Sequence, residues 1–249
     1  MSIIIKSERE IGAMRQAGKI VATVLEKLRE ALKPGLKTSE LDEMALSELA
    51  RLGGRSSFKG YRGFPAHLCV SINDELVHGI PGERFVREGD LVSLDFGAIY
   101  RNFHGDAAIT VGVGEISPGS RELMTATENA LEAGIAAARC GARLGDVSAA
   151  IQDYAEARGF AVVREYTGHG IGRQMHEEPQ IPNFGEPNTG PELKKGMTLA
   201  LEPMLTAGDW RTKVASDGWT VSTADGTLCA HFEHTLAITN GQPEVLTRC

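Results

Sequence analysis

The sequence lacks three features that would each assign it to a particular class of protein. No run reaches the roughly 18 apolar residues that a membrane-spanning helix needs, and the first ten residues lack the apolar core of a secretory signal peptide. Positive charge is in deficit, with 26 Lys and Arg against 33 Asp and Glu and a net charge of -7. These absences predict a cytoplasmic protein with no membrane partner and no nucleic-acid substrate.

Cysteine is scarce, and its spacing indicates no metal or disulfide chemistry. The four cysteines are Cys69, Cys140, Cys229 and Cys249, and none forms a C-x-x-C pair. They predict neither a disulfide framework nor a structural zinc site, which agrees with a reducing cytosol. The chain is long enough for one large core and has no linker-like segment. We therefore expect residues 1–249 to form a single domain.

Hydrophobic periodicity predicts helices and strands in alternating blocks. A capping box of Ser7 and Glu10 starts a first helix that ends before Pro34, and a second helix starts at Thr38 or Ser39. Further helices are predicted over 121–139 and 146–159. Strands are predicted over 68–72, 91–100, 103–113, 161–166, 197–205, 227–232 and 234–239. Helices followed by strands, twice over, predict an α+β fold with two similar halves.

Two aspartates lie in neighbouring apolar strands. Asp95 ends an apolar run, and Asp106 follows eleven residues later. If these strands form a hairpin with Tyr100 and Arg101 at its tip, the two carboxylates are directly opposite, with Cβ atoms ~4.5–5.5 Å apart. Two anions that close repel each other unless a cation or a shared proton lies between them, and a divalent metal is one solution. The alternative is that each aspartate serves a turn, where Asp is common.

Two histidines accompany a glycine-rich segment. His169 lies within Gly168-His-Gly-Ile-Gly, and His176 follows seven residues later. The glycines predict a loop or tight turn rather than a helix, and they let a ligand or metal approach closely. A lone histidine is more often a structural hydrogen-bonding residue. A pair of histidines around such a loop favours a functional site instead.

Two glutamates lie in or beside apolar strands. Glu202 follows Met197-Thr-Leu-Ala-Leu, and Glu233 precedes His-Thr-Leu-Ala-Ile. Glutamate is rarely buried unless it is paired or metal-bound, although exposed strand positions would also explain both residues. With the aspartates and His169, they make a set of four carboxylates and an imidazole without a thiolate, which suits Mn²⁺, Fe²⁺, Co²⁺ or Zn²⁺. Four carboxylates can neutralise two divalent ions, so the set predicts a two-metal hydrolase.

At these residues the chain resembles the type I methionine aminopeptidases of peptidase family M24. The motifs that carry the resemblance are Cys69-Val-Ser-Ile-Asn, Val77-His78-Gly-Ile-Pro, the Asp95 and Asp106 pair, Gly168-His169-Gly-Ile-Gly, His176-Glu-Glu-Pro, Leu201-Glu202-Pro and Glu233-His-Thr. Each motif alone is weak, but all of them in one order over nearly the whole chain are specific. The resemblance implies a pita-bread fold, in which two pseudosymmetric α+β halves enclose a central dimetal site.

The resemblance also implies roles for individual residues. The implied metal ligands are Asp95, Asp106, His169, Glu202 and Glu233, which would hold two divalent ions, Fe²⁺, Mn²⁺ or Co²⁺. Asp106 and Glu233 would bridge the ions. Glu202 would carry a proton to the leaving amine, His176 would hydrogen-bond the developing oxyanion and His78 would contact the scissile peptide. Without the resemblance, His78 reads as a loop residue.

An apolar pocket for the methionine side chain is implied as well. The matching positions are Tyr61, Phe64, Cys69, Met175 and Trp219. Methionine and aromatic side chains can enclose a thioether, but ordinary core residues would give the same pattern. Two positions depart from some bacterial members of the family, which carry Phe at the position of Met175 and Gln at that of His231. The first affects the shape of the pocket, and the second adds a polar group near the metals.

The implied activity is removal of the initiator methionine from nascent, deformylated polypeptides whose second residue is small. The enzyme is expected to be a monomer without an N-terminal zinc or SH3-binding extension, so docking at the ribosome would use the catalytic domain. One alternative is a proline-directed aminopeptidase or dipeptidase, which usually carries a large N-terminal domain, as does a creatine-cleaving relative. Only 94 residues precede Asp95 here.

The spacing and completeness of the ligand set argue against two further alternatives. A type II methionine aminopeptidase has a helical insertion between the last two ligands, and the 31 positions from Glu202 to Glu233 are too few to hold it. A noncatalytic pita-bread protein that binds RNA, histones or other partners would have lost ligands, whereas all five are present. The acidic balance also argues against a nucleic-acid partner.

Overall fold

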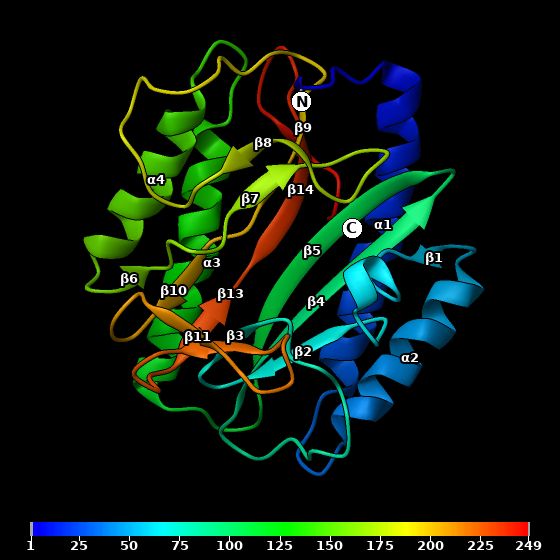
Figure 1. Cartoon of the computed structure of the whole chain (residues 1–249), viewed down its shortest axis with the longest axis vertical. Coiled ribbons are helices and arrows are strands. Elements are labelled where there is room, and N and C mark those ends of the chain that lie inside the picture. The colour runs from blue at the N-terminus through cyan, green and yellow to red at the C-terminus, as the bar shows by residue number, and fades with distance from the viewer. Residues whose placement is uncertain (1, 249) are drawn as a thin grey trace.

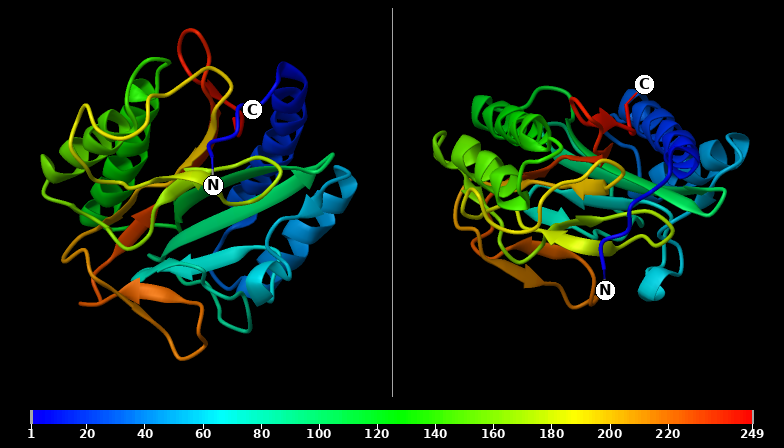
Figure 2. Two further views of the ribbon diagram at one scale, coloured as in Figure 1. Left: turned by 45° about the horizontal axis from the view of Figure 1, so that its top comes forward. Right: turned by 90° about the horizontal axis from the view of Figure 1, so that it is seen from above.

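The structure is a computed structural model that describes residues 2–248, so the prediction for Cys249 lies outside it. Its helices are α1 (Glu8–Ala31), α2 (Thr38–Arg51), α3 (Pro118–Ala137) and α4 (Leu144–Glu156). They pack as two pairs, α1 with α2 and α3 with α4, on one side of a large sheet (Figures 1 and 2). Within residues 2–248, no helix is long and apolar enough to cross a membrane.

The N-terminal boundaries of the helices follow from capping. The predicted capping box is present: Ser7 Oγ accepts a hydrogen bond from the Glu10 N–H at 3.4 Å, and Glu10 Oε2 accepts one from the Ser7 N–H at 2.9 Å. Helix α4 begins two residues earlier than predicted. The reason is that Asp146 is not the cap itself but lies within the first turn, where its carboxylate accepts the N–H of Arg143 at 2.7 Å.

Helix α3 begins three residues before its predicted start. Its cap is Ser117, whose hydroxyl accepts the N–H of Ser120 at 3.0 Å. Pro118 occupies the first helical position, where the missing N–H costs no hydrogen bond. The apolar periodicity becomes regular only after this first turn, so the pattern alone placed the start too late.

One sheet joins both halves of the chain. Its strands are β1 (Arg55–Ser56), β2 (Cys69–Ile72), β4 (Leu91–Tyr100), β5 (Phe103–Gly112), β7 (Gly168–Gly170), β8 (Glu177–Ile181), β9 (Thr198–Leu201), β14 (Glu233–Ala237) and β15 (Glu244–Val245). Across residues 2–248 the order is β1-β4-β5-β14-β9-β7-β8, with β2 paired to β4 and β15 to β14. Strand β14 lies between β5 of the first half and β9 of the second (Figure 1).

The remaining strands form two small sheets, β13-β10-β6 and β11-β12-β3. Their bounds are β3 (Glu75–Val77), β6 (Ala161–Val162), β10 (Met204–Thr206), β11 (Thr212–Val214), β12 (Val221–Thr223) and β13 (Cys229–His231). The strand predicted over 197–205 is interrupted at Pro203, which has no N–H for a ladder, so β9 and β10 belong to different sheets. The strand predicted over 161–166 shortens to Ala161–Val162.

The hairpin of β4 and β5 is present, but its predicted register is wrong. Arg101 and Asn102 form the turn with φ of 48° and 65°, and Asp106 is opposite Gly97 while Asp95 is opposite Ala108. Left-handed conformations at both turn positions suit Asn and strongly disfavour an aromatic residue, which moves the tip one residue beyond the predicted one. The two aspartates are therefore diagonal neighbours on one face of the sheet rather than direct partners.

Strand alternation decides which face carries the aspartates. Along β4, the side chains of Val92, Leu94, Phe96 and Ala98 belong to a core cluster with buried residues of α1 and α2. Successive side chains of a strand point to opposite faces, so Asp95 points away from the helices. On β5, Ala107 joins the same cluster, and its neighbour Asp106 faces the opposite side. The fold thereby separates an apolar, helix-covered face from a face that carries carboxylates.

Candidate metal centre and active site

A cavity of about 140 Å³ lies on the face of the sheet opposite the helices. One water needs roughly 10–15 Å³ on this measure, so the cavity has room for several water-sized groups. Its lining residues are Phe58, Tyr61, Arg62, Phe64, Cys69, His78, Asp95, Asp106, His169, Met175, His176, Glu202, Trp219 and Glu233. Every residue predicted for the site from the sequence is among them, and Phe58 and Arg62 are the two that the sequence reasoning missed.

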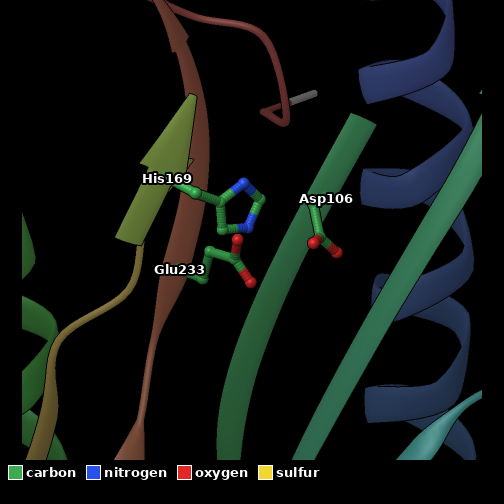
Figure 3. A group of neighbouring side chains, drawn as sticks. All are labelled: Asp106, His169 and Glu233. Atoms are coloured by element: carbon green, nitrogen blue, oxygen red, sulfur yellow. The ribbon is translucent and has the colours of Figure 1, made fainter. Parts of the chain in front are cut away.

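Three side chains from three strands form the centre of the cavity. Asp106 on β5, His169 on β7 and Glu233 on β14 each offer a ligand atom, and these atoms lie within 4.8 Å of one another (Figure 3). Glu202 follows β9, and its Oε1 is 3.6 Å from Nε2 of His169. Asp95 lines the same cavity from β4. The strand order brings these five residues together although 138 positions separate the first from the last.

The carboxylates are electrostatically unfavourable without a cation. Burial raises the pKa of Asp95 to about 7. Burial, followed by repulsion from its neighbours, raises the pKa of Asp106 and of Glu233 well above the ordinary range, and the same two causes raise that of Glu202. Within residues 2–248, one oxygen each of Asp95, Asp106 and Glu233 is buried without a hydrogen-bond partner. Divalent cations would satisfy these oxygens and offset the repulsion, so the donor set fits a metal centre.

His169 is oriented for ligation by a backbone hydrogen bond. Its Nδ1 lies 2.9 Å from the carbonyl oxygen of Gly170, which can only accept, so Nδ1 donates and Nε2 faces the carboxylates unprotonated. Burial lowers the pKa of His169 to about 4, which keeps the ring neutral at pH 7. The predicted loop around His169 is wrong, because Gly168–Gly170 forms β7. A Cβ at Gly170 would lie 2.1 Å from the Glu178 carbonyl oxygen, so close strand pairing requires the glycine.

His176 and Tyr61 form a pair at the wall of the cavity. The Tyr61 hydroxyl is 2.8 Å from Nδ1 of His176, and the two rings stack with centroids 5.4 Å apart. The ring of His176 also lies 4.1 Å from that of His169, centroid to centroid. Loss of hydration in the cavity, followed by the charges of His169 and Arg62, lowers the pKa of His176 to about 3. His176 is therefore a neutral imidazole with one nitrogen already hydrogen-bonded.

His78 occupies the loop directly after β3. Its backbone has a φ of 59°, a left-handed conformation that is uncommon for residues other than glycine. The ring makes edge-to-face contacts with Tyr166 and Trp219, at centroid distances of 5.9 and 6.3 Å. Burial lowers the pKa of His78, which keeps it neutral as well. These contacts fix the ring toward the cavity.

The apolar part of the cavity is a cluster of aromatic and sulfur side chains. Phe58, Phe64, Cys69 and Met175 are buried in one core cluster, against which Tyr61 and Trp219 pack. The ring of Phe64 meets those of Phe58 and Trp219 edge to face, at 6.4 and 5.2 Å between centroids. These side chains therefore fit both interpretations of the sequence, since they pack in the core and also line the cavity.

Arg62 and His231 are two polar residues near the site to which the sequence analysis assigned no role in the reaction. Arg62 has a φ of 49° within a short turn between Gly60 and Gly63. No other lysine or arginine is among the described residues that line the cavity. His231 is 1% exposed on β13, and within residues 2–248 neither of its ring nitrogens has a hydrogen-bond partner. It lies two residues before Glu233 but does not line the cavity. The glycines around Arg62 were a usable signal for a tight loop.

The sequence pattern of metallopeptidase family M24 matches residues 12–240, and the chain belongs to that family. It is 52% identical over 246 residues to methionine aminopeptidase 1 of Bacillus subtilis, covering 99% of each chain. A crystal structure of methionine aminopeptidase from Thermotoga maritima matches with a TM-score of 0.98 at 48% identity, covering 100% of both chains. These likenesses confirm the predicted resemblance to type I methionine aminopeptidases.

More distant relatives share the architecture. The prolidase from Pyrococcus furiosus matches with a TM-score of 0.81 at 22% identity, covering 99% of this chain and 66% of that one. At that identity the likeness shows the fold alone. The pita-bread fold predicted from the sequence is thus confirmed, and so is the expectation of a metal-dependent hydrolase that uses divalent ions. The role of each cavity residue stays a prediction.

Proposed function

We propose that this protein removes the N-terminal methionine from polypeptides whose second residue is small. The observation that carries the proposal is the shape of one cavity, in which five candidate metal ligands adjoin a pocket of aromatic and sulfur side chains. A free α-amino group and its carbonyl would lie at the ligand end, and the thioether side chain would lie in the apolar end. The relatives that match along the whole chain bear the name of this activity.

The proposed ligands are Asp95, Asp106, His169, Glu202 and Glu233. The proposed number of divalent ions is two, because four carboxylates would balance the charge of two such ions; Asp106 and Glu233 would hold them together with the other three ligands. Mn²⁺, Fe²⁺ and Co²⁺ suit the oxygen-rich donor set. When bound, such ions supply positive charge that polarises a carbonyl group and makes water a stronger acid.

Protein side chains would move the proton and stabilise the developing charge. Glu202 is the candidate proton carrier, since its side chain keeps 15% exposure, whereas the Asp106 and Glu233 residues are at most 4% exposed. It would take a proton from water and deliver it to the nitrogen of the leaving amine. The role needs the Tyr61 hydroxyl to donate to Nδ1 of His176, 2.8 Å away, so that Nε2 carries the proton and can donate to the carbonyl oxygen as it becomes negative.

His78 would hold the scissile peptide. Its ring lines the cavity and is fixed by the surrounding aromatic side chains, so it can hydrogen-bond the peptide unit beyond the first residue. The apolar pocket would be formed by Tyr61, Phe64, Cys69, Met175 and Trp219, together with Phe58. We further propose that residues 1–249 act as a single catalytic domain, as a monomer in the cytoplasm, with any ribosome contact made by this domain.

Hydrolysis of short peptides tests the proposal. Purified protein with added Mn²⁺ or Co²⁺ is expected to release methionine from Met-Ala-Ser and to leave the N-formylated peptide intact, because formylation removes the free amino group. Asp106→Asn should abolish turnover and weaken metal binding, since a neutral amide binds cations poorly. Cleavage of an Xaa-Pro peptide instead of Met-Ala-Ser would favour the proline-directed alternative, and cleavage of neither peptide would favour a binding protein.

A further inference from the structure

A buried ion pair joins the N-terminal segment to the strand that follows His176. Nζ of Lys6 lies 2.5 Å from Oε2 of Glu177, and each side chain is only 3% exposed. The other oxygen of Glu177 accepts the N–H of Gln174 at 3.2 Å. Lys6 also donates to the carbonyl oxygen of Ile4 at 3.2 Å. Glu177 directly follows the loop 171–176 and thus ties its own end of that loop both to Gln174 within it and to the N-terminal segment. The loop carries Met175 and His176 into the cavity.

The packing around this pair leaves no spare room. A Cβ added to Gly172 would lie 2.5 Å from Cε of Lys6 and 2.7 Å from Oε1 of Glu177. The loop is anchored on its other side by the Gly172 carbonyl, which accepts the N–H of His104 at 2.8 Å. The N-terminal segment is fixed in turn, because the N–H of Lys6 donates to the carbonyl of Gly196 at 2.8 Å.

A second contact ties the same two segments together at the surface. Arg173 of the loop donates to Oε1 of Glu10 at 3.0 Å, and its guanidinium lies 4.4 Å from the centre of the Phe103 ring. Glu10 belongs to the capping box of α1. The loop that presents His176 is therefore held by residues on both sides of the start of α1.

Stability alone gives no reason to keep such a pair. Desolvating two charges costs about as much as their attraction returns, and buried ion pairs can often be replaced by apolar residues without loss of stability. What a buried pair does provide is a single allowed geometry, because either charge is strongly unfavourable away from the other. In this protein the single geometry of the pair restrains the loop 171–176 rather than the hydrophobic core.

We propose that Lys6 and Glu177 are positioning residues that fix His176 for catalysis, which makes the N-terminal segment part of the active site. The inference rests on the proposed function, since it takes His176 as the donor to the oxyanion. Neither Lys6 nor Glu177 lines the cavity, so they act only through the loop. A shift of about 1 Å in a catalytic group can cost on the order of 100-fold in rate.

The test compares Lys6→Met in two backgrounds with Met-Ala-Ser as substrate. In the wild-type background, Lys6→Met is expected to lower kcat by at least about tenfold with unchanged metal content. In the His176→Ala background, the same change should lower kcat by less than about twofold, because the group that it positions is gone. An equal loss in both backgrounds, or wild-type kcat for Lys6→Met, overturns the proposal.

A second variant removes the risk that an unpaired buried carboxylate unfolds the protein. Lys6→Met/Glu177→Gln leaves no buried charge, so it is expected to fold with a Tm near that of the wild type and still to show the lowered kcat; wild-type kcat in this variant refutes the inference. Lys195→Met is the matched control, since it breaks the exposed pair of Lys195 with Glu8, 3.2 Å apart, and should change nothing. A wild-type enzyme that fails to cleave Met-Ala-Ser contradicts the proposed function instead.

Discussion

Three histidines line one cavity, and their hydrogen bonds separate their roles. Nδ1 of His169 donates to a backbone carbonyl, which leaves Nε2 as a ligand atom beside the carboxylates. Nδ1 of His176 is engaged by the Tyr61 hydroxyl, which leaves Nε2 for a substrate. The ring of His78 contacts the rings of Tyr166 and Trp219. Burial keeps all three pKa values below the ordinary value, so at pH 7 none competes with metal ions as a cation.

At the residue scale, the informative substitution is His176→Ala. We expect kcat to fall by about 10²-fold or more, the usual cost of losing one oxyanion donor, while the bound metal is retained. Steady-state kinetics together with metal analysis of the same sample check this. Tyr61→Phe should give a smaller loss, because it only frees the orientation of His176. Loss of metal from His176→Ala would instead make His176 a ligand.

Individual site residues differed in how well the sequence revealed them. Asp95, Asp106, Glu202 and Glu233 could be found because a carboxylate in an apolar strand needs a partner, which is a local signal. His78 could be found only through the family resemblance. The contact between Tyr61 and His176 joins residues 115 positions apart, and no local pattern reports it. Arg62 was missed because its placement depends on a left-handed backbone conformation.

At the scale of elements, the alternation of apolar and polar residues predicted the bounds of the long strands well, but it did not predict the register in which they pair. Both strands of the β4–β5 hairpin were predicted almost to the residue, but a shift of two positions in the pairing separates the predicted register from the observed one. A two-residue shift keeps every side chain on its face, so the carboxylates still share a face despite the wrong turn. The strands β1, β3, β7, β8, β11, β12 and β15 were not predicted, because short strands paired through long-range contacts leave little periodicity.

Helix α1 packs against the C-terminal segment closely enough that one of its glycines is required. A Cβ at Gly18 would lie 2.1 Å from the carbonyl oxygen of Leu246, whereas one at Gly12 would meet nothing closer than 3.9 Å. Helix propensity favours alanine over glycine by about 1 kcal/mol at both positions. We expect Gly12→Ala to raise the free energy of unfolding by about 0.5–1 kcal/mol and Gly18→Ala to lower it by about 1–3 kcal/mol.

Urea denaturation of the two variants measures whether each substitution raises or lowers the free energy of unfolding. The two positions lie on the same helix, so Gly12→Ala serves as the control for helix propensity. A stabilised Gly18→Ala variant would show that α1 can move away from the C-terminal segment, against the packing described here.

At the scale of the whole molecule, the candidate metal centre draws its residues from both halves of the chain. The first half supplies Asp95 and Asp106, and the second supplies His169, Glu202 and Glu233. A ligand at 100 times its Kd stabilises a protein by about 2.7 kcal/mol, which corresponds to a rise in Tm on the order of 5–10 °C for a chain of this size. We therefore expect chelation to lower Tm by a similar amount, as calorimetry would show.

The Tm of the metal-free protein reports the repulsion between the carboxylates directly. Asp106→Asn removes a buried carboxylate that Asp95 and Glu202 repel, so the metal-free variant should melt at a higher temperature than the metal-free wild type. Added Mn²⁺ should raise its Tm much less than it raises that of the wild type. A metal-free variant with a lower Tm than the metal-free wild type would mean that Asp106 stabilises the fold on its own.

Strand β14 has a consequence for when the protein can begin to work. It supplies Glu233 and also bridges β5 to β9, yet it starts only at residue 233 of 249. A chain that is still being synthesised, or one cut short before this strand, keeps the earlier carboxylates but has nothing to close the sheet around them. We therefore expect catalysis to begin only after β14 has paired with β5 and β9, so that a copy cut short before this strand is inert instead of trimming other chains prematurely.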